Sequence, residues 1–322
     1  MSRFSDLGNA LYSGDKSFNF VGRRKVWYFA AAIIVALSMI IPATKGFTFG
    51  IEFRGGSEFR VSAAADQGVK LAEDAVHEVV ASAQPIVTTI GAQDLRIQTE
   101  KVSDDEAESI RAGLAAAYGV DASAVSSSFI GPSWGQEITG KAITGLLWFI
   151  ALAAVLMALY FRTIKMSIAA VIALLHDLVL TAGVYGTLGF EVTPAAVIGF
   201  LTILGYSLYD TVVVFDKIRE NTLEVEHSET ATFGERVNLA INQTLVRSIN
   251  TSVVAVLPVS AILFIGAVFL GAGTLKDIAL ALFIGIIVGT YSTIFIAAPI
   301  YSHLREGEKI YADAAKKVLA NR

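Results

Sequence analysis

Ionisable side chains lie inside stretches of this sequence that are otherwise apolar enough to enter lipid. His176 and Asp177 lie about ten residues into one such stretch, and Asp210 lies in the next one, six residues before Asp216. At 1.5 Å per residue, Asp210 is about 9 Å inside the boundary that Asp216 marks. A charge at mid-bilayer costs about 2.5–3.5 kcal/mol, so such a group faces protein or a water-filled path. These residues are therefore candidates for proton exchange within a membrane.

Asp210 is the strongest of these candidates because polar residues surround it at helical spacing. Tyr206 lies four residues earlier on the same helix face, and Ser207 and Thr211 extend the polar strip. A later apolar stretch begins with Arg247, which we expect at a depth comparable to Asp210. A buried carboxylate can exchange a proton when its pairing with an arginine changes. Ser248, Asn250, Thr251 and Ser252 follow Arg247 and continue the polar character.

Two structural interpretations compete with proton exchange. Asp210 and Arg247 could form a static ion pair that locks two helices together, although we favour proton coupling. The charged run from Asp216 to Glu220 is better interpreted as a solvated cap at the membrane boundary. For His176 and Asp177, the residue types alone fit a structural role as well as a functional one.

The composition indicates an integral membrane protein. Of 322 residues, 54% are hydrophobic and 17% are charged, and the mean hydropathy is +0.60, whereas a soluble domain has about 25% charged residues. The apolar residues form blocks of about 20, the length that crosses the hydrocarbon core. We predict six transmembrane helices at 26–44, 142–161, 166–188, 194–215, 252–270 and 278–300. The first is too long for a cleaved signal peptide and is interpreted as a retained anchor.

Several chemistries are not supported by the sequence. It contains no cysteine, which excludes disulfides, thiol nucleophiles and cysteine metal sites. Phosphate-loop, metal-ligand and nucleophilic-triad patterns are not found, and the four histidines are scattered along the chain. We therefore expect a transport component and not an enzyme, with no cofactor and no metal, that draws on the membrane gradient or on a partner for energy.

The lysines and arginines predict how the chain crosses the membrane. They concentrate in segment 1–25, between helices two and three, between helices four and five, and in the tail 301–322. The turn after the third helix has none, and the turn after the fifth has only Lys276. By the positive-inside rule, both termini are cytoplasmic. The membrane core comprises 26–44 and 142–300, and the long segment 45–140 lies outside the cytoplasm.

Segment 45–140 has the pattern of a small α+β domain. Strands are predicted at 47–53 and 58–61 around a Gly55-Gly56 hairpin turn, then at 87–90, 95–99 and 123–130. Helices are predicted at 71–83 and from Ser103, where Glu106 completes a capping box, to Tyr118. These elements form two halves, each similar to a β-α-β unit, and this indicates a ferredoxin-like extracytoplasmic domain.

Taken in order along the chain, these motifs resemble the SecF members of the SecD/SecF family. The run Gly205–Asn221, which contains Asp210, is similar to that family's signature, as is Gly50–Gly56 with Phe53, Gly55 and Gly56. Further similar motifs are Phe18–Tyr28, His176-Asp177, Gln243–Leu245 with Arg247 and Thr251-Ser252, and Val288–Ser292. Two positions depart from the family pattern: Glu52 replaces a common Asp, and Tyr209 replaces a common Asn.

The resemblance implies half of a resistance-nodulation-division type core of six plus six helices in the bacterial cytoplasmic membrane. It implies an accessory role in Sec protein export, with SecD, the SecYEG channel, unfolded polypeptide and membrane lipids as partners and without nucleic acid. Asp210 would carry the proton and Arg247 would be its charge partner, supported by His176, Asp177, Tyr206, Thr211 and Thr251. The alternatives are a passive assembly scaffold, or half of a proton-driven exporter of small molecules or lipids. That exporter would need a larger exported domain or a second long loop.

Overall fold

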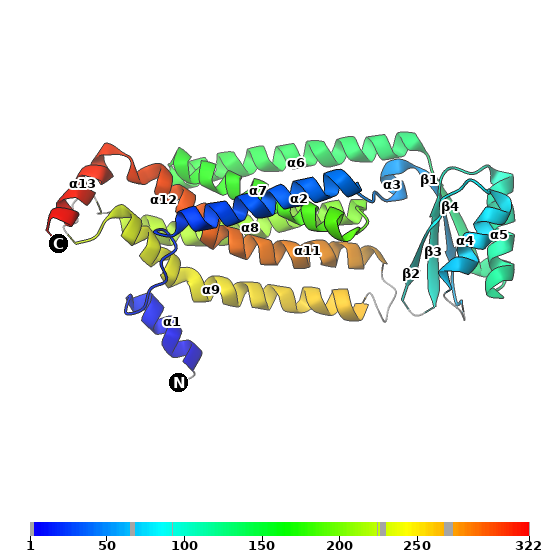
Figure 1. Cartoon of the computed structure of the whole chain (residues 1–322), viewed down its shortest axis with the longest axis horizontal. Helices are drawn as coiled ribbons and strands as arrows, with labels where there is room; N and C mark the ends of the chain where they lie inside the picture. The colour runs from blue at the N-terminus through cyan, green and yellow to red at the C-terminus, as the bar shows by residue number, and fades with distance from the viewer. Residues whose placement is uncertain are drawn as a thin grey trace.

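The computed structural model consists of a long helical bundle with a small α/β domain at one end (Figure 1). It describes residues 3–64, 68–91, 93–223, 225, 230–266 and 273–321. Both ends of the chain lie at the end of the bundle opposite the α/β domain. Three short helices are found there: α1 (Arg3–Ser13), α12 (Ala298–Glu306) and α13 (Lys309–Ala320).

Among the described residues, six helices are long and apolar enough to cross a membrane, as predicted. They begin with α2 (Arg24–Lys45), α6 (Pro132–Phe161) and α7 (Ile164–Leu188). The others begin with α8 (Pro194–Thr222), α9 (Phe233–Ala261) and α11 (Gly273–Ser292). Two π-helical segments, Ile262–Gly266 and Thr293–Ala297, prolong α9 and α11. The predicted end of the fifth span at Leu270 lies outside the described residues.

Several helices start well before the apolar segments that predicted them. Helix α9 begins at Phe233, where a capping box between Thr232 and Glu235 satisfies the first backbone N–H groups. Arg247 is therefore in the middle of a continuous helix and not at its start. Helix α6 begins at Pro132, directly after the last strand, and proline at this position has no N–H to leave unsatisfied.

Helices α7, α8 and α11 form the inside of the bundle, whereas α2, α6 and much of α9 present apolar side chains outward. A helix in lipid satisfies its backbone internally and can expose apolar side chains without penalty. The largest such side chains include Phe29, Leu147, Trp148, Leu152, Val254 and Leu257. This arrangement defines a multi-pass membrane protein.

Small residues bring α8 and α11 into close contact. Gly199 lies against Ala281, Gly285 against Ile203, and Gly289 against Ser207. The spacing of Ala281, Gly285 and Gly289 is the small-xxx-small pattern that lets two membrane helices approach closely. This contact fixes the position of α8 along the bundle relative to α11, and α8 carries Asp210.

A methyl group at Gly285 is expected to separate these two helices. Its Cβ would overlap the branched side chain of Ile203, so we expect Gly285→Ala to lower the free energy of unfolding by about 1–3 kcal/mol. Gly145→Ala is the matched control, because no atom lies within 4 Å of the new Cβ, and it should be neutral or slightly stabilising. Thermal unfolding of the purified chain measures both, and equal stability of the two variants would contradict the proposed contact.

The α/β domain has the element order β-α-β-β-α-β. Its strands are β1 (Gly56–Val61), β2 (Ile86–Ile90), β3 (Asp94–Thr99) and β4 (Val125–Ile130). Helix α4 (Val69–Val79) follows β1, helix α5 (Asp104–Tyr118) follows β3, and a 3-10 turn (Ala122–Ala124) precedes β4. The strands form one sheet in the order β2-β3-β1-β4, with every neighbouring pair antiparallel.

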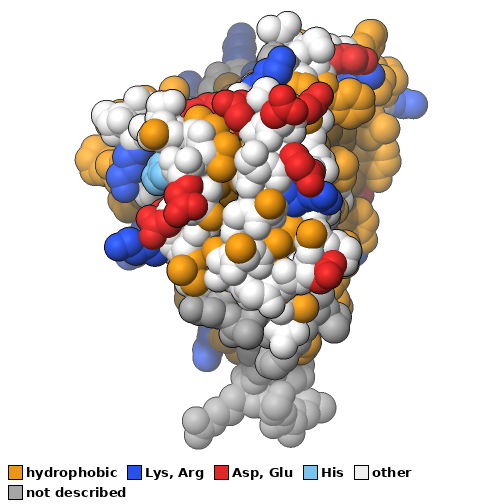
Figure 2. Space-filling model, turned by 90° about the vertical axis from the view of Figure 1, so that its right-hand side faces the viewer, with side chains coloured by type: hydrophobic (Ala, Val, Ile, Leu, Met, Phe, Trp, Pro, Cys, Tyr) orange, Lys and Arg blue, Asp and Glu red, His pale blue; other side chains and the backbone are white. Residues whose placement is uncertain are grey.

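The core of this domain lies between one face of the sheet and the two helices. Phe59, Leu95 and Ile97 from the strands meet Ile110 and Leu114 from α5, and all five side chains are buried. Figure 2 looks onto this end of the molecule and shows acidic and basic side chains mixed over its surface. The charged exterior and apolar interior are those of a domain that lies outside lipid.

Most of the predicted elements of this domain are confirmed, but the first hairpin is wrong. The pairing of β2 with β3 and the capping box of α5 are present as predicted. Residues Ile51–Arg54 instead form a short helix, α3, and Phe49 makes only an isolated bridge to Val192. Gly55 and Gly56, with φ of 77° and 144°, carry the chain from α3 into β1 and do not form a hairpin turn.

Candidate functional site

Buried polar side chains line the contact between α7, α8, α9 and α11. Two of them are carboxylates, Asp177 on α7 and Asp210 on α8, which are 2% and 5% exposed. Around them lie the buried residues His176, Ser207, Thr211, Ser248, Ser252, Ser292 and Thr293. A polar strip within an apolar bundle is costly and is typical of a functional site.

Asp177 is fully engaged in hydrogen bonds. The Ser207 hydroxyl donates to its Oδ2 atom at 2.5 Å, and His176 Nδ1 lies 3.2 Å from its Oδ1 atom. The Thr181 hydroxyl donates to the Asp177 backbone carbonyl at 2.7 Å. Because each carboxylate oxygen has a partner, this group ties α7 to α8 in the state that the structure represents.

Asp210 differs from Asp177 because only one of its oxygens is satisfied. The Ser248 hydroxyl on α9 donates to Oδ1 at 2.9 Å, while Oδ2 is buried and has no hydrogen-bond partner among the described residues. A buried carboxylate with an unsatisfied oxygen is costly when charged, and protonation lowers that cost by removing the charge. Asp210 is therefore the carboxylate in this strip whose burial is only partly compensated by hydrogen bonds among the described residues.

The structure does not contain the direct pair expected between Asp210 and Arg247. Both residues are described, yet Arg247 is exposed and the Ser248 hydroxyl makes the contact with Asp210. Successive residues of an α-helix are rotated by about 100°, so only one of these two neighbours can point at α8. The sequence predicted the correct part of α9 but not which of its residues makes the contact.

The other predicted polar residues differ in how directly they join the strip. Thr211 meets Thr293 of the segment after α11, with 3.0 Å between their hydroxyl oxygens. The Tyr206 hydroxyl is buried beside Ser252, and the partly buried Thr251 precedes Ser252 on α9. Thr290, within the quoted motif Val288–Ser292, contacts Ser252, whereas sequence reasoning missed Thr293. The available signal for Thr293 was its spacing of four residues from Gly289 and eight from Gly285, which places it on the face of small residues that meets α8.

The predicted motif residues Phe53, Gly55 and Gly56 lie in and just after α3. This helix is at the end of the bundle that joins the α/β domain (Figure 1). A Cβ at Gly56 would overlap the Thr99 carbonyl oxygen, and one at Gly135 of α6 would overlap the Phe53 carbonyl oxygen. The glycines therefore permit close approach of backbone segments at the junction. These residues lie at the junction and do not contact Asp177 or Asp210.

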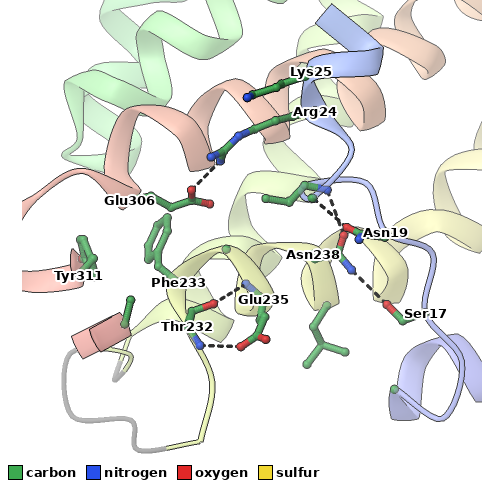
Figure 3. Close-up of a pocket in the computed structure, with 16 residues that line it drawn as sticks. Ser17, Asn19, Arg24, Lys25, Thr232, Phe233, Glu235, Asn238, Glu306 and Tyr311 are labelled. Carbon is green, nitrogen blue, oxygen red and sulfur yellow. Dashed lines mark hydrogen bonds and ion pairs between the residues drawn. The ribbon is translucent and has the colours of Figure 1, made fainter. Parts of the chain in front are cut away.

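A cavity of about 900 Å³ lies at the opposite end, near the chain termini (Figure 3). Arg24 pairs with Glu306 at 2.6 Å across it, and Asn238 donates to the Ser17 hydroxyl at 3.1 Å. Asn238 also accepts from the backbone N–H of Phe20 at 2.8 Å. These bonds attach the start of α2 and the segment before it to α9 and α12. The polar side chains that line this cavity therefore hold the helix ends together.

The bundle, its buried carboxylates and the single α/β domain define the class as a multi-pass helical membrane protein with a polar intramembrane site. Residues 111–307 match the family model described as "Protein export membrane protein SecD/SecF, C-terminal", and residues 40–66 match the "SecD/SecF GG Motif". The chain belongs to the SecD/SecF family of protein-export membrane proteins.

Individual relatives agree with this family. The protein translocase subunit SecF of Streptomyces coelicolor is 43% identical over all of this chain and 86% of its own length. The corresponding Mycobacterium tuberculosis protein is also 43% identical, over 97% of this chain and 72% of its own. The crystal structure of SecDF, a translocon-associated membrane protein from Thermus thermophilus, has a TM-score of 0.77 at 30% identity. It aligns with 91% of this chain, which spans 39% of the SecDF chain.

Proposed function

We propose that this chain is an accessory subunit of Sec protein export that uses the proton gradient to promote late translocation of unfolded polypeptide. The observation that carries the proposal is Asp210, a buried carboxylate with one unsatisfied oxygen in a family of protein-export membrane proteins. This chain aligns with 39% of the SecDF chain, and we infer that SecD supplies the part of the assembly that this chain does not match. Together the two chains would form a six-plus-six core of the resistance-nodulation-division type beside the SecYEG channel and its surrounding lipids.

The geometry supports a specific way for Asp210 and Arg247 to couple a proton to movement. In the present arrangement Asp210 faces the neutral hydroxyl of Ser248, which suits a protonated carboxyl. Once the proton leaves, the carboxylate attracts the guanidinium of Arg247, one position away on α9. A rotation or shift of α9, together with a change in the long Arg247 side chain, would exchange these two neighbours. His176, Asp177, Tyr206, Thr211 and Thr251 would hold the surrounding helices during that exchange.

We place the chain in the bacterial cytoplasmic membrane with both termini in the cytoplasm and the α/β domain outside. The supporting observation is the concentration of lysine and arginine at the bundle end that carries the termini. The β-α-β-β-α-β order and antiparallel sheet support a ferredoxin-like fold for the outer domain. This domain would meet the emerging polypeptide and move when Asp210 changes protonation.

Depletion of the chain separates this proposal from its alternatives. We expect depleted cells to accumulate the precursor of a secreted reporter, and we expect the chain to purify together with SecD. An exporter of small molecules or lipids would instead lose efflux of those compounds while the reporter was secreted normally. A passive scaffold would be rescued by any variant that restores assembly, including one without the Asp210 carboxylate. Normal reporter secretion after complete depletion would contradict the export function.

A further inference from the structure

The α/β domain is joined to the bundle by an arginine that contacts three carboxylates. Arg96 on β3 donates from Nε to Glu58 at 2.6 Å, from Nη1 to Glu191 at 3.1 Å and from Nη2 to Glu52 at 3.4 Å. The arginine and the three glutamates are all partly buried, with 17–25% of each side chain exposed. This degree of burial weakens screening by water and strengthens each ion pair.

The three carboxylates belong to different parts of the molecule. Glu58 lies on β1 of the domain, Glu52 lies on the connecting helix α3, and Glu191 lies in the turn between α7 and α8. The connecting segment is separately fixed to that turn, since Gly50 N–H donates to the Val192 carbonyl at 2.9 Å. The contact between Arg96 and Glu191 therefore adds a direct link from the sheet itself to the bundle.

The charges at this junction make the arginine essential to it. Oε2 of Glu52 and Oε1 of Glu191 are buried without a hydrogen-bond partner among the described residues, and both lie beside Gly50. Burial raises the pKa of Glu52, although its backbone hydrogen bond and Arg96 act in the opposite direction. Burial lowers the pKa of Arg96, but the surrounding carboxylates outweigh it and the net pKa is raised. Lys276 and Arg60 line the cleft beside this junction, but in the described part of the chain Arg96 is the cation that pairs with all three carboxylates.

A cleft of about 1070 Å³ separates the polar face of the sheet from the end of the bundle. Its domain side includes Thr88 and Thr89 of β2, and its bundle side includes Phe264 and Leu280. Arg96 and Glu191 also line the cleft. The domain therefore has space in which to change its angle over the bundle if the link is broken.

We propose that the Arg96–Glu191 ion pair is a latch that holds the α/β domain in its present position over the end of the bundle, and that the domain swings across the cleft when the pair is broken. Glu191 lies in the turn that joins the two helices carrying Asp177 and Asp210. A movement of those helices would reach the domain through this pair. The latch does not depend on the proposed export function, because it is defined by the position of the domain.

The position of the domain can be measured with two spin labels. The natural chain has no cysteine, so Thr89→Cys on β2 and Leu188→Cys at the exposed end of α7 provide the only attachment sites. Pulsed electron resonance on the full chain in lipid nanodiscs gives the distribution of distances between them. We expect one narrow peak with Arg96 present, and a broader distribution at longer distances in Arg96→Gln.

Two further variants make the result specific. Glu191→Gln removes only the carboxylate on the bundle, leaves Arg96 paired with Glu58 and Glu52, and is expected to broaden the distribution as Arg96→Gln does. Arg60→Gln removes an arginine from the same cleft, but its partner Asp94, at 2.6 Å, lies within the domain, so the peak should not change. An unchanged peak in folded Arg96→Gln, or equal broadening in Arg60→Gln, would overturn the latch. An unchanged narrow peak in Glu191→Gln would also overturn it.

Discussion

Asp210→Asn is expected to reduce export of a secreted reporter to the level seen in cells depleted of the chain, with normal amounts of the variant in the membrane. Asparagine has nearly the same size and can still accept the hydrogen bond that Ser248 donates to Oδ1. It cannot bind and release a proton at this position. The variant should therefore keep its fold and lose only the step that depends on protonation.

Asp216→Asn is the matched control for this experiment. Asp216 lies six residues later on the same helix, is exposed, and accepts a hydrogen bond from the Tyr160 hydroxyl at 3.0 Å. The same chemical change is made there outside the buried strip, so we expect export close to that of the unaltered chain. If both variants lost export to the same extent, the effect could not be assigned to a buried proton site.

Gly56→Ala is expected to destabilise the α/β domain by about 3 kcal/mol or more. Gly56 has a φ of 144°, a conformation that costs a residue with a side chain about 1–3 kcal/mol. The new Cβ would also overlap the Thr99 carbonyl oxygen on the neighbouring strand, so β1 and β3 would have to separate. Limited proteolysis of the full chain at increasing temperature should show cleavage within residues 56–130 at a lower temperature.

Gly119→Ala separates these two costs. Gly119 ends α5 with a φ of 63°, but no atom lies within 4 Å of the added Cβ. The variant therefore has the conformational cost of about 1–2 kcal/mol without the overlap. Equal sensitivity of Gly56→Ala and Gly119→Ala to protease would show that contact with Thr99 contributes little.

The sequence was most informative where one physical requirement dominates. The thickness of the hydrocarbon core fixes the length of an apolar segment, and all six predicted spans correspond to long helices. The cost of burying charge predicted that Asp210 would lie against other helices, and it is buried in contact with α9. The capping box at Ser103 and Glu106 depends only on residues three apart and is present as predicted.

The sequence was less informative where several arrangements satisfy the same local pattern. Gly55 and Gly56 suit a hairpin turn as well as the exit from a short helix, and packing against α6 selects the second. Arg247 and Ser248 are neighbours, and only the rotation of α9 decides which of them meets Asp210. That rotation depends on tertiary contacts that no local pattern encodes. The contact of Arg96 with Glu191 joins residues far apart in the chain and has no sequence signature.

Reporter export into inverted membrane vesicles tests most directly whether Asp210 couples the proton gradient to translocation. Translocation is measured with the gradient present and after a protonophore has collapsed it, at equal amounts of the chain. With Asp210 present, we expect the gradient to increase export. With Asp210→Asn, we expect export to be the same in both conditions and equal to the level without a gradient. A gradient-dependent increase in Asp210→Asn vesicles as large as that of the unaltered chain would contradict the proposed role of Asp210.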